Sequence, residues 1–325
     1  MKDILSFMNV KKAVITAAAR GERLYPVSDT VQKAMLPIVD TDGINKPIIQ
    51  IIAEEALSSG IEEICIICAP GDEERYIENF KSLHSTLIKA FKQNEWAQAQ
   101  ASSINNLLDR VSFKVQENPK GYGDAVYLAK DFVKSEPFLL LLGDYLYVSD
   151  IKGKRCAQQL IELAVKEDCS VSAVNPTIEH QISKYGTLTG KSVPNCNGVY
   201  QIEKIIEKPS VSHAELELQT PGLRAGYYLC FFGMHVFKPA IFEFIENFIK
   251  SKKNSNESIL LTPFQQELAN SDKYLALEMK GTRYDTSKKL GLMQAQIALG
   301  LAGSIKNEVL SIIVNILAES EKRDH

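Results

Sequence analysis

The chain has 325 residues, of which 45% are hydrophobic, and a formal net charge of -3 at pH 7 with a pI near 6.0. This length and apolar content can bury a large core, so we expect one large α/β domain or a main domain with appendages. The slightly negative charge gives no electrostatic footprint for nucleic acid or an acidic membrane surface, and we expect neither as a partner.

Targeting and cysteine signals indicate an intracellular protein. No stretch is apolar enough for a signal peptide or a membrane span, which predicts a cytoplasmic protein. The six cysteines are scattered, as suits reduced thiols. Cys65 and Cys68 form a C-x-x-C motif in an apolar run, but an offset of three on a strand points them to opposite faces, which predicts core packing. The five histidines lack ligand spacing, so no zinc site is expected.

The most informative stretch is residues 14–37, which read VITAAARGERLYPVSDTVQKAMLP. Its apolar start predicts a buried strand. The small residues that follow would let a ligand approach the backbone; they include Ala17, Ala18 and Gly21. Arg23 then offers a planar fork of donors and Lys33 a mobile point charge, the combination that holds a polyphosphate. The alternative is an ordinary first strand and turn with two solvated basic residues.

Strand and helix patterns alternate through the first half of the chain. Strands are expected at 61–69, 111–116, 137–142 and 170–175, and helices at 47–59, 73–110, 125–132 and 156–166. This rhythm predicts parallel pairing with right-handed crossovers. Within the helices, we interpret Glu54, Glu55, Glu73 and Glu74 as solvated.

The second half begins with a β-rich segment at 183–206. A strand is expected to run through 237, helices at 239–250 and 262–269, a last strand at 277–285, and closing helices at 287–301 and 309–321.

Carboxylates follow two of these strands. The strand at 137–142 is the most apolar, should lie centrally, and is followed by Gly143 and Asp144. A carboxylate at the end of a central parallel strand lies where open α/β sheets bind ligands, and there it can hold Mg²⁺ beside substrate phosphates. Asp285 ends the last strand in the same manner. The alternative for Asp144 or Asp150 is a helix N-cap.

Two further segments are candidates for ligand contacts. Gly121 and Gly123 bracket a turn after Gln116, where the backbone can pass close to a flat ligand, although a plain glycine turn is the alternative. Glu207 and Lys208 stand at a strand tip before a proline. Acid beside base suits a ligand with hydroxyls and a phosphate, and a solvated edge pair is the alternative.

The motifs ARGERLYP, QKAMLPIVD, PIIQIIAEEALSSGI, KYGTL, IIEKP and MKGTRYDTSKKLGLMQA occur in this order, with the loop 116–125 among them. In this combination the chain, from about residue 11 to 301, resembles the bacterial UTP–glucose-1-phosphate uridylyltransferases of the sugar-phosphate nucleotidyltransferase family. The resemblance implies in-line attack of glucose 1-phosphate on the α-phosphate of UTP, with release of pyrophosphate and Mg²⁺ as cofactor.

The resemblance also implies an architecture. It is a Rossmann-like three-layer α/β fold with a mixed, mainly parallel central sheet, a small β-rich sugar-binding insertion and C-terminal helices. The catalytic domain would span 1–285, with a nucleotide half at about 11–150 and a sugar-phosphate half at about 170–285. The helices at 286–325 would be an oligomer contact in a homodimer or homotetramer.

Residue roles follow from the matching motifs. The implied assignments are the catalytic residues Arg23, Lys33 and Lys208, the nucleotide-binding residues Ala17, Ala18, Gly21, Gln116 and Gly121, the sugar-binding residues Tyr185, Gly186, Glu207 and Gly226, and the metal ligands Asp144 and Asp285. Gln116 is expected to hydrogen-bond the uracil edge, and Lys208 to bind the sugar phosphate.

The chain departs from the family pattern around the site. Ala19 replaces a usual glycine, Glu22 a threonine and Tyr227 an arginine, and Thr286-Ser287 stands where Cys-Gly is usual. The alternatives are therefore a sister enzyme for another nucleotide or sugar, or a nucleotide-sugar-binding protein without turnover. A dehydrogenase is disfavoured because no G-x-G-x-x-G follows the first strand.

Overall fold

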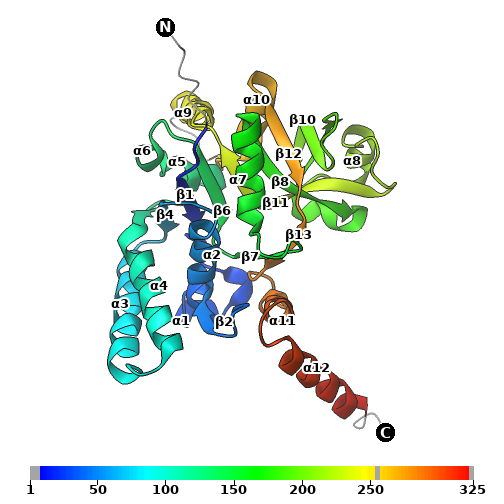
Figure 1. Ribbon diagram of the computed structural model, residues 1–325. Helices are drawn as coiled ribbons and strands as arrows, with labels where there is room; N and C mark the ends of the chain where they lie inside the picture. The colour runs from blue at the N-terminus through cyan, green and yellow to red at the C-terminus, as the bar shows by residue number, and fades with distance from the viewer. Residues whose placement is uncertain (1–7, 253–256, 322–325) are drawn as a thin grey trace.

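A nine-stranded mixed sheet forms the centre of the protein in the computed structural model, which describes residues 8–252 and 257–321 (Figure 1). In spatial order its strands are β5 (Val111–Val115), β4 (Glu63–Cys68), β1 (Lys12–Thr16), β6 (Phe138–Leu142), β11 (Tyr227–Phe237), β8 (Ser170–Ile178), β12 (Tyr274–Glu278), β10 (Val199–Glu207) and β9 (Gly186–Ser192). Strands β11 and β10 run antiparallel to their neighbours, and the others share one direction. The expected mixed, mainly parallel sheet is confirmed.

Helices cover both faces of this sheet and make three layers. One face packs against α2 (Ile48–Leu57), α3 (Asp72–Ala90), α4 (Glu95–Arg110) and α7 (Cys156–Glu167). The other packs against α5 (Tyr122–Tyr127), α6 (Lys130–Val133), α9 (Ala240–Ser251) and α10 (Thr262–Ser271). Because successive strand residues point to opposite faces, Val14 and Ile15 enter different cores, and central strands need apolar residues on both sides.

The C-x-x-C motif follows the same rule. Cys65 lies in the core beside α5 and α9, whereas Cys68 lies in the core beside α3 and α4. Burial raises the pKa of the Cys65 thiol to about 11 and that of the Cys68 thiol to about 12. Both are free thiols on opposite sides of one strand, so the packing role predicted from their spacing is confirmed.

The single strand expected at 277–285 is wrong, because the chain changes sheets there. β12 ends at Glu278, and β13 (Gly281–Asp285) pairs antiparallel with β7 (Tyr145–Ser149) in a separate two-stranded sheet. The helix expected at 125–132 is likewise two short helices, α5 and α6. Short elements complete the fold: α1 (Val27–Thr30), α8 (Val211–Glu217), the hairpin β2 (Pro37–Val39) and β3 (Asn45–Pro47), and 3-10 helices at Glu22–Leu24, Lys33–Met35 and Glu179–Lys184.

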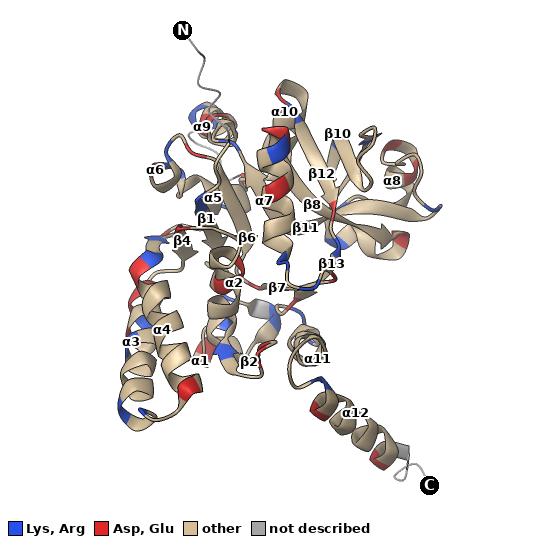
Figure 2. Ribbon diagram, viewed as in Figure 1, with Lys and Arg blue, Asp and Glu red and all other residues tan. Residues whose placement is uncertain are grey.

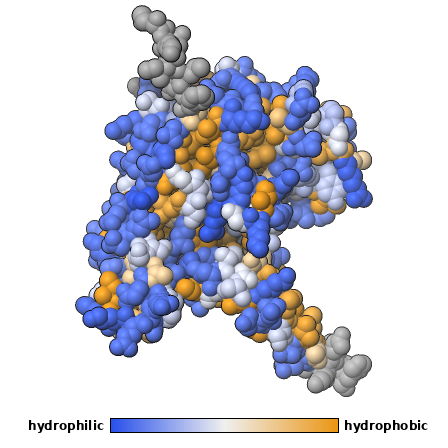
Figure 3. Space-filling model, in the orientation of Figure 1, coloured by the Kyte–Doolittle hydropathy of each residue, from blue (hydrophilic) through white to orange (hydrophobic). Residues whose placement is uncertain are grey.

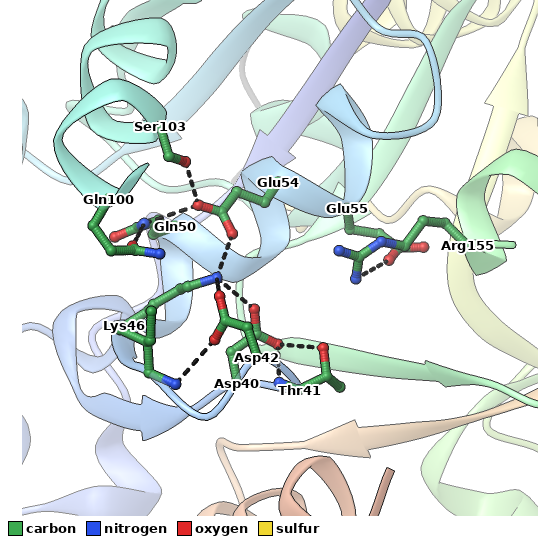
Figure 4. Close-up of polar contacts among 11 residues, drawn as sticks. Asp40, Thr41, Asp42, Lys46, Gln50, Glu54, Glu55, Gln100, Ser103 and Arg155 are labelled. Atoms are coloured by element: carbon green, nitrogen blue, oxygen red, sulfur yellow. Dashed lines mark hydrogen bonds and ion pairs between the residues drawn. The ribbon is translucent and has the colours of Figure 1, made fainter. Parts of the chain in front are cut away.

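The interpretation of Glu54 and Glu55 as solvated is also wrong. Figure 4 shows both on α2 with polar partners from neighbouring elements. Glu55 is 4% exposed, and its Oε1 accepts a hydrogen bond from the backbone N–H of Ala157 in the first turn of α7. Glu54 accepts from Lys46 Nζ at 2.9 Å and from Ser103 Oγ at 2.6 Å. The other elements packed around α2 cover its polar side, which its own periodicity does not reveal.

The two C-terminal helices differ in how they meet the body of the molecule. α11 (Gly291–Ala302) contacts the β2–β3 hairpin, and α12 (Lys306–Glu321) projects beyond it (Figure 1). Figure 3 shows apolar residues on this projecting helix, and Ile312, Val314, Ile316 and Leu317 are each more than half exposed. Acidic and basic residues are interspersed over the elements in Figure 2. Among the described residues, no helix has the length and apolar character needed to span a membrane.

Candidate active site

Loops at the carboxyl ends of β1, β4 and β5 enclose a pocket of about 490 Å³, which we call the nucleotide pocket. The carboxyl ends of parallel strands are where open α/β sheets bind ligands. Of the predicted site residues, those that line this pocket are Ala18, Gly21, Arg23, Lys33, Gln116 and Asp144. The structure thus brings together residues that are up to 126 positions apart in the chain (18 to 144).

Two of the predicted nucleotide-binding residues frame this pocket rather than line it. Ala17 is buried, and its backbone N–H donates to the carbonyl of Ile67 at 2.7 Å, which ties the end of β1 to β4. Gly121 has φ of +124°, and a Cβ there would stand 2.6 Å from the backbone oxygen of Ile259. Glycine is therefore required at 121 by the close approach of another loop.

Lys33 and Asp144 form an ion pair at the centre of the site. Lys33 is buried, and its Nζ donates to Asp144 Oδ2 at 2.7 Å. Asp144 occupies the turn between β6 and β7, and the N-cap position of α7 is Arg155. The helix-cap alternative for Asp144 and Asp150 is therefore wrong. The pair places one positive and one negative group on the wall of the nucleotide pocket.

The second carboxylate lies on the adjoining strand. Asp285 ends β13 opposite Tyr145, the residue after Asp144. Its Oδ1 accepts hydrogen bonds from the N–H of Ser287 at 3.0 Å and from its hydroxyl at 2.5 Å. The N–H and hydroxyl of Thr286 both donate to the carbonyl oxygen of Asp144, at 2.9 and 2.8 Å. Thr286 and Ser287 thus fasten the two aspartates to each other.

This donor set fits a magnesium ion in its chemistry. Asp144 and Asp285 offer oxygen ligands, which Mg²⁺ prefers, and within the described ranges no group of three or more acidic, histidine or cysteine residues is arranged to hold a metal ion. Two carboxylates leave most of an octahedral shell to phosphates and water, as is usual for Mg²⁺. The buried hydroxyl of Tyr122 lies nearby, and no described residue gives it a well-aligned hydrogen bond.

A second pocket of about 910 Å³ opens on the other side of Asp144, and we call it the sugar pocket. Predicted residues that line it are Arg23, Asp144, Tyr185, Gly186, Glu207, Lys208 and Asp285. A Cβ on Gly186 would stand 2.7 Å from the ring of Phe231, so only glycine fits there. The two pockets meet at the residues that line both, which are Arg23, Asp144 and Ser287.

The structure does not bring Gly226 to the sugar pocket. It lies at the start of β11 and lines a different pocket beside α8. The β11 glycine that does line the sugar pocket is Gly233, with φ of +84° and a Tyr145 ring atom 2.7 Å from where its Cβ would be. The β11–β8 register shifts between Phe231 and His235 around it. A lone glycine inside the apolar run YYLCFFGMHVF is the signal that identifies such an irregularity in a sequence.

Sequence reasoning also missed a basic cluster around Tyr185. Lys288 Nζ donates to the Tyr185 hydroxyl at 2.9 Å, and the Arg283 guanidinium carbon lies 4.1 Å from the centre of the Tyr185 ring. Burial acts to raise the pKa of Tyr185, but Lys288 and Arg283 together hold it below its ordinary value. Lys288 also lines the sugar pocket, where its charge suits a phosphate. The signal was the basic pair shortly after Asp285.

A buried hydrogen-bond network lies under the sugar pocket. His235 Nδ1 is 2.5 Å from the Ser172 hydroxyl, which also contacts the Tyr274 hydroxyl, and Gln265 Nε2 donates to Tyr274 at 3.0 Å. Burial lowers the pKa of His235 to about 3, so the imidazole is neutral at pH 7. His235 and Gln265 both line the pocket. This wall of the pocket is therefore polar and uncharged.

The sheet order, the paired pockets and the two aspartates define a nucleotidyltransferase, and comparison with known proteins agrees. A model of the family described as nucleotidyl transferase matches residues 12–299. The chain belongs to this family.

Similar proteins are found among uridylyltransferases. The chain is 32% identical over 322 residues to the UTP–glucose-1-phosphate uridylyltransferase of Streptococcus pneumoniae, covering 97% of this chain and 99% of that protein. It is also 32% identical to the enzyme of the same name from Streptococcus pyogenes, over 96% of both.

Among solved structures, an apo UDP-glucose pyrophosphorylase is 28% identical with a TM-score of 0.74, and covers 89% of this chain and 98% of its own. The UTP-bound UGPase from Acinetobacter baumannii is 26% identical with a TM-score of 0.73, over 94% and 99% of the two chains.

Proposed function

We propose that this protein is a UTP–glucose-1-phosphate uridylyltransferase, which makes UDP-glucose and pyrophosphate from UTP and α-D-glucose 1-phosphate. The names of its relatives support the substrates. The observation that carries the proposal is the junction of the two pockets at Arg23 and Asp144. A nucleotide in one pocket and a sugar phosphate in the other would meet with their phosphates at this junction.

The reaction requires positioning and charge neutralisation more than proton transfer. A phosphate oxygen of the sugar phosphate attacks the α-phosphate of UTP in line, and pyrophosphate leaves. Arg23 and Lys33 would hold the triphosphate and stabilise the charge that develops on it, while Lys208 and Lys288 would hold the sugar phosphate. Asp144 and Asp285 would hold Mg²⁺, which would supply positive charge to offset the negative charge of the phosphates.

The departures from the family pattern are compatible with turnover. Thr286 and Ser287 replace the usual Cys-Gly, yet both donate hydrogen bonds that position the carboxylate region. The side chain of Glu22 lies outside what the structure describes. Two alternatives are therefore decided by the pyrophosphate assay. They are a nucleotide-sugar-binding protein without turnover and a sister enzyme for another nucleotide or sugar.

Pyrophosphate release is the direct measurement. We expect turnover with UTP, glucose 1-phosphate and Mg²⁺, little with dTTP or GTP, and none when EDTA replaces the metal. Asp144→Asn and Asp285→Asn should each lower kcat by about 10²-fold or more. Asp150→Asn is the matched control, because Asp150 is exposed at the end of β7. A clear preference for dTTP or GTP, or UDP-glucose binding without turnover, would contradict the proposal.

The organisation that accompanies this function is also a proposal. We place the nucleotide half at about 11–150, the sugar-phosphate half at about 170–285, and the protein in the cytoplasm. The exposed apolar residues of α12 support a role for the C-terminal helices in a homodimer or homotetramer. Light scattering after gel filtration tests this, and Ile316→Asp should lower the measured mass if α12 is the contact.

A further inference from the structure

The side chain of Gln116 is held in one orientation by its neighbours. Gln116 follows β5 directly, lines the nucleotide pocket and is 6% exposed. Its Nε2 donates to Asp124 Oδ2 at 2.7 Å and to the carbonyl oxygen of Gly121 at 3.3 Å. Asp124 Oδ2 also lies 3.3 Å from the N–H of Lys120, which donates to it. One carboxylate oxygen therefore accepts hydrogen bonds from both the loop backbone and the Gln116 amide.

The chemistry of these partners decides which end of the amide faces them. An ionised carboxylate and a backbone carbonyl are acceptors only, so the atom turned towards them must be the NH₂ group. The end of the amide that remains is Oε1, and no described residue donates a hydrogen bond to it. Gln116 therefore presents a hydrogen-bond acceptor to the nucleotide pocket.

Two loops clamp Asp124 in place. The N–H of Gly123 donates to the carbonyl of Ile259 at 2.7 Å, and the N–H of Ile259 donates to the carbonyl of Lys120 at 2.7 Å. A Cβ on Gly123 would stand 2.7 Å from the carbonyl oxygen of Leu260. Both of these hydrogen bonds join backbone groups of the two loops. Asp124 is therefore fixed relative to Gln116 before any ligand binds.

We propose that Asp124 is a positioning residue that sets the base preference of the nucleotide pocket by fixing Gln116 as an acceptor. The proposal rests on the proposed function and on Gln116 facing the Watson–Crick edge of the base. Uracil, thymine and guanine carry an N–H at the centre of that edge and can donate to Oε1. Cytosine and adenine carry a lone pair there, which would face an acceptor without a hydrogen bond. Asp124 thus selects for UTP against CTP through Gln116.

The test is the ratio of kcat/KM for UTP and CTP in Asp124→Asn. An asparagine at 124 can donate as well as accept, so Gln116 is free to turn its NH₂ group towards the base. We expect the UTP:CTP ratio to fall about tenfold, which corresponds to about 1.4 kcal/mol, mainly through a gain with CTP. Asp131→Asn is the control, because Asp131 is an exposed carboxylate on the neighbouring helix α6. An unchanged ratio in Asp124→Asn would overturn the proposal.

The unmodified protein supplies a second measurement that needs no variant to fold. It should use 5-methyl-UTP, which keeps the N3–H, and reject CTP by about tenfold or more. Equal use of UTP and CTP would overturn the proposal.

If no nucleotide is turned over, the proposed function fails, and calorimetric Kd values for UTP and CTP still test Asp124. If the unmodified protein binds UTP more tightly than CTP and Asp124→Asn loses this preference, the positioning role is supported. Equal Kd values for UTP and CTP in the unmodified protein refute it.

Discussion

Lys46 is a buried cation whose removal should destabilise the fold. It lies on β3, is 5% exposed, and its Nζ contacts three carboxylates, Asp40 at 2.7 Å, Asp42 at 2.7 Å and Glu54 at 2.9 Å (Figure 4). Burial disfavours its charged form, but bonds to Asp40 and Asp42 outweigh burial and hold the pKa of Lys46 above its ordinary value. Lys46→Met keeps the apolar stem and removes only the charge.

The expected cost follows from the exposure of the three partners. Asp42 is 41% exposed and can be hydrated when Lys46 is lost, so its share is below 1 kcal/mol. Asp40 is 3% exposed and Glu54 15% exposed, so each would remain as a largely buried charge without a counterion. Removing one member of a buried ion pair costs about 3–5 kcal/mol. We therefore expect Lys46→Met to lose about 3–5 kcal/mol out of a typical 5–15 kcal/mol.

Urea unfolding followed by far-UV circular dichroism measures this loss. The double variant Lys46→Met/Asp40→Asn should recover about 1–3 kcal/mol of it, because the buried charge is removed together with its partner. Lys250→Met is the control: Lys250 pairs with Glu246 at 3.1 Å on the surface of α9 and should cost less than 1 kcal/mol. A loss below 1 kcal/mol in Lys46→Met, or no recovery in the double variant, would refute this reasoning. Lys46 contributes its full stabilisation below its unfolded pKa of about 10.4, so the comparison is made at pH 7.

Three further predictions concern the site. Lys33→Met should lower kcat/KM by about 10²–10³-fold in the pyrophosphate assay, while its stability falls by only about 1 kcal/mol, because Asp144 is partly exposed and can be hydrated. Lowering the pH from 7 to 5 should reduce the free energy of unfolding by about 2 kcal/mol through His235. The reason is that the His235 side chain takes up a proton near pH 6.5 in the unfolded chain but only near its pKa of about 3 in the folded protein. Urea unfolding of His235→Gln should lack this loss. Gly233→Ala should lower Tm and activity together, because its Cβ would clash with a tyrosine ring, whereas Gly153→Ala, with φ of +74° and open space, should cost only about 1–2 kcal/mol of backbone strain. Equal Tm shifts in the two glycine variants would contradict the packing argument.

The N-terminal half of the protein could be predicted well because its signals are local. The strand after Lys11 and the strand at 137–142 are short apolar runs with residues for both faces of a parallel sheet, and each is followed by the residues that line a pocket. The small residues after β1 and the carboxylate after β6 directly follow the strands that place them in the site. Asp144 and Lys33 meet because the strands that precede them, β6 and β1, are neighbours in the sheet.

The errors arose where the determinant is a contact between distant segments. Glu55 resembles any other helical glutamate until α7 places its N-terminus against it. Only Met279 and Lys280 separate β12 from β13, so the transfer of the chain from the central sheet to β7 becomes evident only from the strand pairing. Gly226 and Gly233 both lie near the β11 strand, and only the pairing of that strand shows which glycine meets the sugar pocket.

The segment 259–262 carries no motif, yet it supports both halves of the site. Its first residue, Ile259, is hydrogen-bonded to the loop that holds Gln116 through the N–H of Gly123. Its last residue, Thr262, donates its hydroxyl to Glu207 Oε2 at 2.5 Å in the sugar pocket. Because backbone length is fixed, these residues set the distance between the loop proposed to bind the base and the carboxylate proposed to bind the sugar. In the proposed reaction in-line attack would depend on that distance, so we expect a segment without catalytic side chains to influence whether the two substrates meet in reactive geometry.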